Sequence, residues 1–210
     1  MGSALLLSYR SLTVRRDVRT MKDAFINVRK GSVMNTQNNI RKGTPRDVAE
    51  LAALYDALND HLTATVNHPG WKKGVYPVRE NAANAAEDGT LFVYMVDGNI
   101  AGTVILSHEP EEAYHGAAWL IEAAYQDVIV IHTLAVHPAY LKRGIGYDLV
   151  QFALTYAKEQ GQKSVRLDVY EHNRPAIRLY EACGFRYIDK VDLGYGEYGL
   201  EYFLLYEYVL

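Results

Sequence analysis

The sequence predicts a mixed α/β fold in which a central sheet of six to seven strands is flanked by about four helices. Residues 128–136 form an almost continuous apolar run, which is typical of a strand buried on both faces. Residues 91–96 and 100–107 are two further strand-like runs, and the Asp97-Gly98 pair between them favours a hairpin turn. Because helical patterns alternate with these strands, both element types are expected within one domain.

The segment before the hairpin predicts one strand and two helices. A short strand is expected over residues 38–43. Thr44 and Pro45 then favour a helix that begins at Arg46, because Thr caps free amides and Pro lacks an amide at a position where none is needed. After a loop rich in turn-forming residues, a second helix is expected over residues 78–87.

The strand at 128–136 should stop before Pro138, which cannot donate a hydrogen bond to a sheet. Apolar residues at three-to-four spacing then predict a helix that begins at or within Gly144 and Gly146 and ends near Gly161. Residues 109–127 lack a clear periodicity. They either continue the hairpin strand or cross the sheet edge as a loop.

The last part of the chain predicts a strand, a helix and two more strands. Residues 164–170 alternate in polarity as a strand does, with Val165, Leu167 and Val169 on one face. Asn173 is a typical helix cap and Gly184 a typical helix end, so a helix should lie between them. The final two strands are expected near residues 186–193 and 202–209, the second close to the end of the chain.

The length of 210 residues suits a single domain with a sizeable core, expected over residues 34–210. Residues 1–33 differ, because they carry 7 of the 22 Lys and Arg but only 2 of the 25 Asp and Glu. They are expected to be a poorly ordered basic extension. The remaining 15 basic and 23 acidic residues give the domain a net charge of about −8, which argues against nucleic acid as its partner.

Other bulk features point to a cytoplasmic protein without a membrane anchor. The single Cys183 excludes an internal disulfide framework and suits a reducing compartment. The apolar stretch at residues 4–7 is too short for a membrane span. No metal is expected, because the seven His show no ligand spacing and one Cys cannot build a thiolate zinc site. The oligomeric state is open, with a homodimer as one alternative.

The strand, glycine-containing turn and helix start around residues 136–146 have the features of an anion site. Glycines let the backbone approach a ligand, and the first amides of a helix lack partners at its positive end. Lys142 and Arg143 add positive charge, so a phosphate group is the expected ligand. The common dinucleotide and ATPase motifs are both excluded, because Leu149 stands where a third glycine is needed and no Gly-Lys-Ser/Thr occurs.

Several linked motifs resemble the GNAT superfamily of acyl-CoA-dependent N-acyltransferases. They are Leu134-Ala-Val-His-Pro, the Lys-Arg-Gly-Ile-Gly run ending at Gly146, Leu-Asp-Val-Tyr-Glu-His-Asn173, and Leu-Tyr180-Glu-Ala-Cys-Gly-Phe185. The resemblance implies a mostly antiparallel sheet and transfer of an acetyl group from acetyl-CoA to a primary amine within a ternary complex. The acceptor would be a small molecule or a peptide.

The resemblance also implies roles for individual residues. Leu134, Ala135 and Val136 would bind the pantetheine arm through their backbone. Asn173 would contact the cofactor arm, and Tyr180 would stand beside the sulfur as the general acid. The pyrophosphate would be held by the loop and first helical turn, that is by Leu141, Lys142, Arg143, Gly144, Ile145, Gly146 and Tyr147.

One position departs from the family pattern, because Leu141 occupies the place of a Gln or Arg. Backbone donors survive this change, but a side-chain contact is lost. The alternative function is therefore a catalytically inactive, CoA-binding regulatory module, which would bind CoA without releasing acetyl groups.

The expected general base is His132, because an imidazole interrupting an apolar strand needs a purpose or a partner. It lies two positions before Leu134, so both are expected on the same face of the strand. The family often has Glu near this point, and His keeps the capacity to accept a proton. A structural histidine, Glu122, Asp127 and direct proton loss to water are the alternatives.

Three aromatic residues are candidates for the acceptor pocket. Trp71 and Tyr76 lie in the loop before the second helix, which covers the acceptor entrance in similar proteins. Trp119 lies in the aromatic segment between the hairpin and the long buried strand. For Trp71 and Tyr76, the competing interpretation is that both rings pack the loop onto the domain.

Overall fold

The computed structural model describes residues 39–210, so the predicted basic extension at residues 1–33 lies outside the described part. Seven strands and four α-helices make up this part of the chain. The strands are β1 (Ile40–Lys42), β2 (Leu91–Val96), β3 (Asn99–Ser107), β4 (Val128–Val136), β5 (Ser164–Tyr170), β6 (Arg186–Val191) and β7 (Phe203–Val209). The helices are α2 (Val48–Ala64), α3 (Arg79–Glu87), α4 (Ile145–Glu159) and α5 (Arg174–Ala182).

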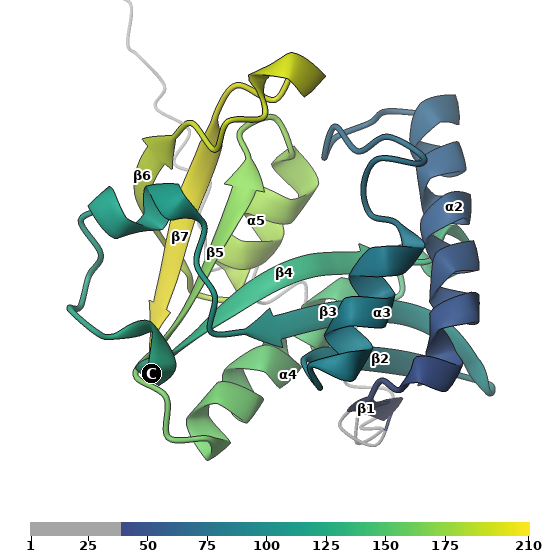
Figure 1. The fold of residues 1–210 in the computed structure, drawn as a ribbon, viewed down its shortest axis with the longest axis horizontal. Coiled ribbons are helices and arrows are strands. Elements are labelled where there is room, and N and C mark those ends of the chain that lie inside the picture. The colour runs from purple at the N-terminus through teal and green to yellow at the C-terminus, as the bar shows by residue number, and fades with distance from the viewer. Residues whose placement is uncertain (1–38) are drawn as a thin grey trace, which may run out of the picture. The chain divides into compact units, whose positions relative to one another are not determined.

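The seven strands form one sheet in the order β1-β2-β3-β4-β5-β7-β6 (Figure 1). Five of the six neighbouring pairs are antiparallel, and only β4 and β5 run parallel. The predicted mixed, mostly antiparallel sheet is therefore confirmed. The apolar strand β4 lies at its centre, as its composition indicated.

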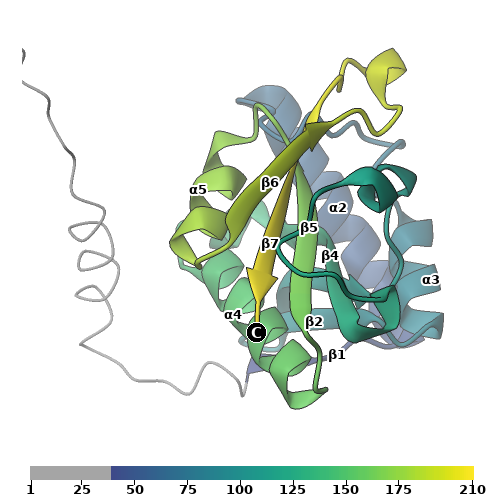
Figure 2. The same ribbon diagram turned by 90° about the vertical axis from the view of Figure 1, so that its left-hand side faces the viewer.

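Helices cover both faces of the sheet, as Figures 1 and 2 show. On one face, α2 and α3 pack on β2 and β3 around Leu51, Leu54 and Val93. On the opposite face, α4 and α5 pack on β3 to β5 and β7 in the larger core cluster, which includes Leu149 and Leu167. Each helix buries its apolar side, and the sheet is enclosed between two layers.

The start of α2 shows how local signals fix a helix end. Thr44 is in an extended conformation and Pro45 opens a short 3-10 turn, after which the α-helix begins at Val48. The amide and the hydroxyl of Thr44 both donate to the Asp47 carboxylate, which also accepts from Arg41 at 2.7 Å. The α-helix therefore begins two residues after the predicted start at Arg46, and one 3-10 turn precedes it.

Residues 109–127 cross the sheet face as a loop and do not extend the hairpin strand. This segment contains two 3-10 turns, Glu112–Gly116 and Tyr125–Asp127. It lies on the same side of the sheet as α2 and α3 (Figure 1). Tyr114 anchors it by packing against Val130 and Leu205, which are fully buried. The loop therefore covers the half of that face that the two helices leave open.

A buried ion pair lies under this loop. Arg166 on β5 donates to Glu207 on β7 at 2.8 Å, and both side chains are almost completely buried. A second guanidinium nitrogen donates to the carbonyl of Ile121 at 2.8 Å. The loop at residues 109–127 thus covers the polar face of β5, and the Arg166 charge is paired with Glu207 inside the protein.

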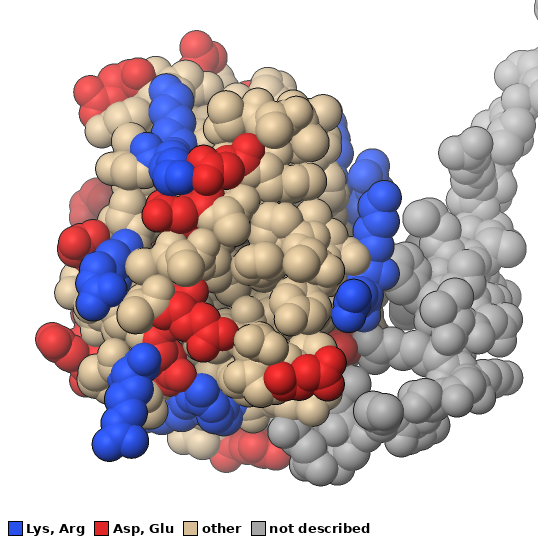
Figure 3. Space-filling model, turned by 90° about the vertical axis from the view of Figure 1, so that its right-hand side faces the viewer, with Lys and Arg blue, Asp and Glu red and all other residues tan. Residues whose placement is uncertain are grey.

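The surface of the described residues carries no single-signed field on the side where α2 lies. Figure 3 shows acidic and basic side chains intermixed there, with broad uncharged areas between them. Within residues 39–210, no helix is both long enough and apolar enough to cross a membrane.

Candidate active site

The central feature of the site is the separation of the two parallel strands. β4 and β5 pair only at Val128–Val130 with Ser164–Arg166. Beyond these three pairs the strands diverge, and Figure 1 shows β5 turning away from β4. The edge of β4 from residue 131 onward therefore has no strand partner on that side, although β3 still pairs with its other edge. An extended ligand can bind to such an edge through backbone hydrogen bonds.

A β-bulge lies in β4 beside this opening. Ile105 of β3 pairs with His132 and Thr103 pairs with Ala135, so one residue of β3 faces two residues of β4. Thr133, within the bulge, has a positive φ of 37°. Such strain in a non-glycine residue is typical of functional sites, and a bulge redirects the side chains that follow it.

The bulge overturns the prediction that His132 and Leu134 share a face. Leu134 packs with the core under α4 and α5. His132 follows the alternation of Val130, which packs on the opposite side, and its Nε2 contacts the carbonyl oxygen of Glu109 at 3.1 Å. One extra residue reverses the register of a strand, so a spacing of two no longer means one face.

The turn predicted to bind an anion lies where α4 begins. Gly144 is the N-cap and has a φ of 82°, a left-handed conformation that suits glycine. Within residues 39–210, the amides of residues 142–146 donate to no carbonyl or side chain, while the amide of Asp148 returns to the Gly144 carbonyl at 3.0 Å. The free amides and the positive helix end together fit a phosphate group.

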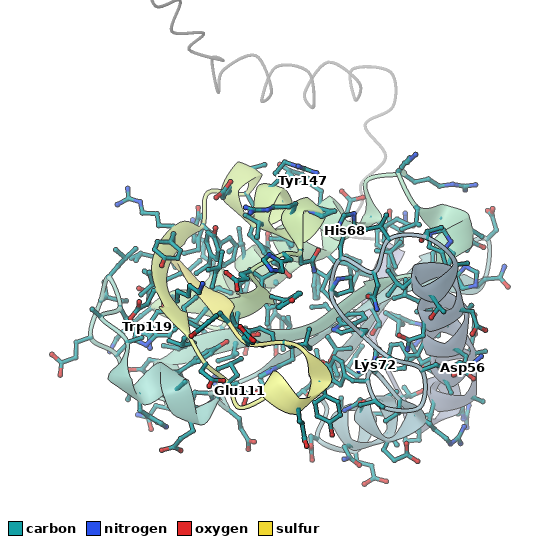
Figure 4. All side chains as sticks on the ribbon, turned by 90° about the horizontal axis from the view of Figure 1, so that it is seen from above. Asp56, His68, Lys72, Glu111, Trp119 and Tyr147 are labelled. Atoms are coloured by element: carbon teal, nitrogen blue, oxygen red, sulfur yellow. The ribbon has the colours of Figure 1, made fainter. Side chains whose placement is uncertain are left out.

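The side chains of this turn contribute less than its backbone. Leu141 is 40% exposed, so its replacement of a polar family residue disturbs no core packing. The Arg143 guanidinium lies 5.1 Å from the centre of the Tyr140 ring, close to the turn. Tyr147 lies in the first turn of α4, on the same side of the molecule as His68 (Figure 4). The departure at Leu141 therefore leaves the backbone donors intact.

Helix α5 carries Asn173 as its N-cap and Tyr180 about two turns later. Asn173 caps the helix as predicted, because its side-chain oxygen accepts from the Ala176 amide at 3.4 Å. Tyr180 is only 7% exposed, and its hydroxyl has no hydrogen-bond partner among residues 39–210. Burial raises the pKa of Tyr180, and the nearby Asp168 carboxylate adds to this effect. At neutral pH the phenol therefore keeps its proton.

One side of the opening is formed partly by Tyr76. Its hydroxyl is hydrogen-bonded to Oγ1 of Thr133 in the β-bulge. Burial raises the pKa of Tyr76 to about 12. Trp71 lies edge-on to the Tyr76 ring, with centroids 5.4 Å apart, and also packs on the cluster under α2 and α3. Tyr76 thus lines the opening, whereas Trp71 supports it from behind.

The structure places Trp119 at a different location. Its ring lies 4.3 Å from the Arg166 guanidinium, and its indole N–H donates to the Tyr114 carbonyl at 2.9 Å. Trp119 lines a cavity of about 420 Å³ together with Tyr125 and Glu122. This arrangement supports the buried ion pair and does not bring Trp119 to the bulge.

Sequence reasoning missed Asp168, a carboxylate that faces the opening. It lies two positions after Arg166, the last residue of β5 that pairs with β4, and on the same face of the strand. The Tyr114 hydroxyl donates to its Oδ1 at 2.7 Å. Burial raises the pKa of Asp168, while the Tyr114 hydrogen bond and the nearby His132 oppose that rise. The sequence feature that could have indicated Asp168 is its position two residues after Arg166, which puts opposite charges on one face of a central strand.

The other acidic candidates lie elsewhere. Asp127 is at the paired end of β4 and forms an ion pair with Lys163 at 2.7 Å. Glu122 lines the cavity around Arg166. Of the carboxylates considered as proton acceptors, Asp168 is the one that lies beyond the point where the strands diverge.

Split parallel strands, a bulge and a helix start with free amides characterise the site, and comparison with known proteins identifies the family. A model of the acetyltransferase (GNAT) family matches residues 51–185. The chain belongs to this family. The predicted family membership is therefore confirmed.

Two relatives illustrate the range of similarity. An uncharacterized N-acetyltransferase of Methanocaldococcus jannaschii is 30% identical over 162 residues, which cover 73% of this chain and 65% of the relative. The streptothricin acetyltransferase of Streptomyces lavendulae is 28% identical over 49% of this chain and 47% of its own length. The chain thus spans about two thirds of the length of the first relative and about half of the length of the second.

Solved structures share the fold. An acetyltransferase of the GNAT family from Streptococcus agalactiae has a TM-score of 0.68 at 21% identity, covering 81% of this chain and 94% of that chain. A structure from Salmonella typhimurium, solved with its cofactor acetyl-CoA, has a TM-score of 0.58 at 17% identity, covering 81% of this chain and 92% of that chain.

Proposed function

We propose that this protein is an N-acetyltransferase that transfers the acetyl group of acetyl-CoA to a primary amine by direct attack in a ternary complex. The observation that carries the proposal is the divergence of β4 and β5 after three residue pairs, beside the free amides at the start of α4. Membership of the acetyltransferase family supports the same activity. The single cysteine and the nature of the cofactor favour a cytoplasmic location.

The residues present fit acetyl-CoA. The amides of residues 142–146 and the N-terminus of α4 would hold the diphosphate, and the unpaired edge at Leu134 and Val136 would bind the pantetheine arm. Bound acetyl-CoA would supply an activated thioester carbonyl. A backbone amide within residues 134–136 would polarise that carbonyl as negative charge develops on its oxygen.

Asp168 is our proposed proton acceptor. An amine attacks only when it is neutral, yet a lysine-like amine has a pKa of about 10.4, so it reaches the site as an ammonium ion. A carboxylate with a raised pKa both attracts the ammonium and accepts its proton more readily than an ordinary carboxylate. His132 contacts the Glu109 carbonyl and lies near Asp168, so its role becomes one of tuning that carboxylate.

Tyr180 is our proposed general acid. The amine nitrogen bonds to the acetyl carbon, the carbon–sulfur bond breaks, and Tyr180 donates its proton to the departing sulfur. The acylated nitrogen then loses its surplus proton, which restores Tyr180, while the proton on Asp168 passes to water. The raised pKa of Tyr180 keeps this proton available at neutral pH.

Incubation with acetyl-CoA and a panel of primary amines, read out as free thiol, tests the proposal. We expect amine-dependent thiol release together with an acetylated amine identified by mass spectrometry. A protein that binds acetyl-CoA tightly but releases no thiol with any amine would contradict the proposal.

A further inference from the structure

A cavity lies under the loop at residues 109–127, apart from the place where β4 and β5 diverge. Its volume of about 420 Å³ is within the usual range of small-molecule sites. Arg166 in its lining is buried, whereas Glu122 is exposed, so the cavity has a closed floor and an open rim. Figure 4 shows Trp119, which also lines it, apart from Tyr147 at the start of α4.

The walls of this cavity combine small and aromatic side chains. Three alanines of the loop line it and leave space between the rings. The Arg166 guanidinium lies 4.3 Å from the centre of the Trp119 ring and 5.3 Å from the centre of the Tyr125 ring. Because aromatic rings pack well on one another, these walls favour a ligand that carries a flat apolar group.

Two polar groups in the lining can donate hydrogen bonds to a ligand. The Tyr125 hydroxyl is buried and has no hydrogen-bond partner among residues 39–210. Arg166 uses Nε for Glu207 and Nη2 for the carbonyl of Ile121, which leaves Nη1 without an acceptor in the same part of the chain. Buried polar groups are normally paired, and a carboxylate offers two oxygens that accept from such donors.

The charges around the cavity restrict the ligand further. Glu207 already neutralises Arg166 inside the protein. Glu122 at the rim has no ion pair within residues 39–210. A ligand that brought only a carboxylate would therefore add to an uncompensated negative charge. A ligand that also carries an ammonium group would pair that group with Glu122.

We propose that this cavity is a second small-molecule site, which binds a free aromatic α-amino acid. The carboxylate of the amino acid accepts from Arg166 and from the Tyr125 hydroxyl. Its ring packs on the aromatic wall at Trp119, and its ammonium group pairs with Glu122. The site is separate from the opening between β4 and β5, so the inference does not depend on the proposed function.

Calorimetric titration of the full-length protein with phenylalanine and two analogues tests the chemistry of the ligand. Phenylalaninamide lacks the carboxylate, and phenylpropanoate lacks the ammonium group. We expect phenylalanine to bind about tenfold more tightly than either analogue, which is the worth of one charged hydrogen bond. No binding of phenylalanine at millimolar concentration, or equal affinity for phenylalaninamide, would overturn the inference.

Tryptophan fluorescence tests the location of the ligand. The chain has two tryptophans, so Trp71→Phe leaves Trp119 as the one reporter. We expect its emission to change as phenylalanine is added, with the same dissociation constant as calorimetry gives. Calorimetric binding without any change in Trp119 emission would place the ligand elsewhere and contradict the inference.

Two tyrosines provide a matched variant and control. Tyr125→Phe keeps the ring and removes a hydroxyl that has no partner among residues 39–210, so the fold should be retained. The affinity for phenylalanine should fall about tenfold. Tyr187→Phe makes the same change on an exposed tyrosine of β6, outside the cavity lining, and should leave the affinity unchanged. Equal affinities in the two variants would count against the site.

Two glutamates of the loop test the ammonium contact. Glu122→Gln should reduce the preference for phenylalanine over phenylpropanoate from about tenfold to near one. Glu112→Gln removes a charge from another exposed side chain, outside the lining, and should leave the preference at about tenfold. An unchanged preference in Glu122→Gln would refute the contact. Circular dichroism of every variant checks the fold.

None of these measurements involves acetyl transfer. A protein that acetylates amines but binds no aromatic amino acid overturns this inference and leaves the proposed function standing. A protein that binds phenylalanine at Trp119 but releases no thiol supports the inference and contradicts the proposed function.

Discussion

The two faces of the central sheet differ in how their functional residues are distributed along the chain. On the face of α4 and α5, the residues expected to bind the cofactor lie in one stretch, from residue 134 to residue 180. On the face of α2 and α3, the groups around the opening come from four separate segments. They are Tyr76, Glu111, Asp168 and Tyr195.

The difference predicts that the two faces of the sheet tolerate substitutions differently. The face proposed to bind the cofactor would use backbone amides that a turn and a helix start leave free, so Leu141 can replace a polar residue without removing them. The face proposed to bind the acceptor would use side chains, each of which carries its own chemistry. Substitutions on the face of α2 and α3 should therefore affect catalysis and substrate choice. Substitutions on the face of α4 and α5 should affect cofactor affinity only where they alter the backbone.

The largest expected effect is at Tyr180, where the two faces meet. Tyr180→Phe keeps the ring that packs on Phe185 but removes the proton that the leaving sulfur needs. We expect kcat to fall by about 100-fold or more, the usual worth of a general acid, with the affinity for acetyl-CoA nearly unchanged. Steady-state rates and calorimetry measure the two quantities. Full turnover by the variant across the pH range would exclude the role.

Asp168→Asn should have the next largest effect on rate. Asn can still accept the Tyr114 hydroxyl bond but cannot take a proton, so kcat/KM should fall by about 100-fold. In the unmodified protein, activity should fall as pH drops through the pKa of Asp168, which burial places above the ordinary Asp value. His132→Gln is the comparison and should cost less. A larger loss in His132→Gln than in Asp168→Asn would return the base role to His132.

The same substitution should stabilise the fold at neutral pH. Because the pKa of Asp168 is raised in the folded state, the folded protein binds this proton more tightly than the unfolded chain does. Stability therefore decreases as pH rises from the ordinary Asp pKa through the raised one. We expect Asp168→Asn to raise the thermal midpoint at neutral pH and to change it little in strong acid. A lower midpoint at neutral pH would show that the carboxylate stabilises the fold.

The smallest expected effect is on acetyl-CoA affinity, when a glycine next to α4 is replaced. Two glycines allow the effect of the backbone before α4 to be distinguished from a general effect of strain. Gly144 and Gly161 flank α4, and both have positive φ values, 82° and 70°. Replacing either by Ala should cost about 1 kcal/mol of stability, because a side chain disfavours this conformation. Only Gly144→Ala should also weaken acetyl-CoA binding, by a fewfold. Equal affinities in both variants would mean that the turn before α4 does not hold the cofactor.

Much of the fold could be predicted because its signals are local. The strand at 128–136, the strand at 164–170 and the helix cap at Asn173 agree with the structure residue by residue. Apolar runs and helix caps determine secondary structure within a few residues, and the tertiary packing here agrees with these local preferences. The glycine turn that opens α4 was predictable for the same reason.

The acceptor face could not be predicted to the same degree. The bulge at Thr133 carries no glycine or other sequence signal, and it alone separates His132 from the face of Leu134. Asp168 was missed because its importance depends on where β5 leaves β4 and on Tyr114, 54 residues away in sequence. The structure differs from the prediction for Trp119, because nothing in the local sequence indicates that its ring packs on the Arg166 guanidinium.

Hydrogen exchange of backbone amides, measured with and without acetyl-CoA, tests the central claim most directly. The claim predicts slower exchange at residues 142–146 and along the unpaired edge of β4 around Leu134 and Val136, while Val128–Val130, already paired with β5, stay unchanged. Unchanged exchange at the start of α4, or protection confined to the face of α2 and α3, would contradict it.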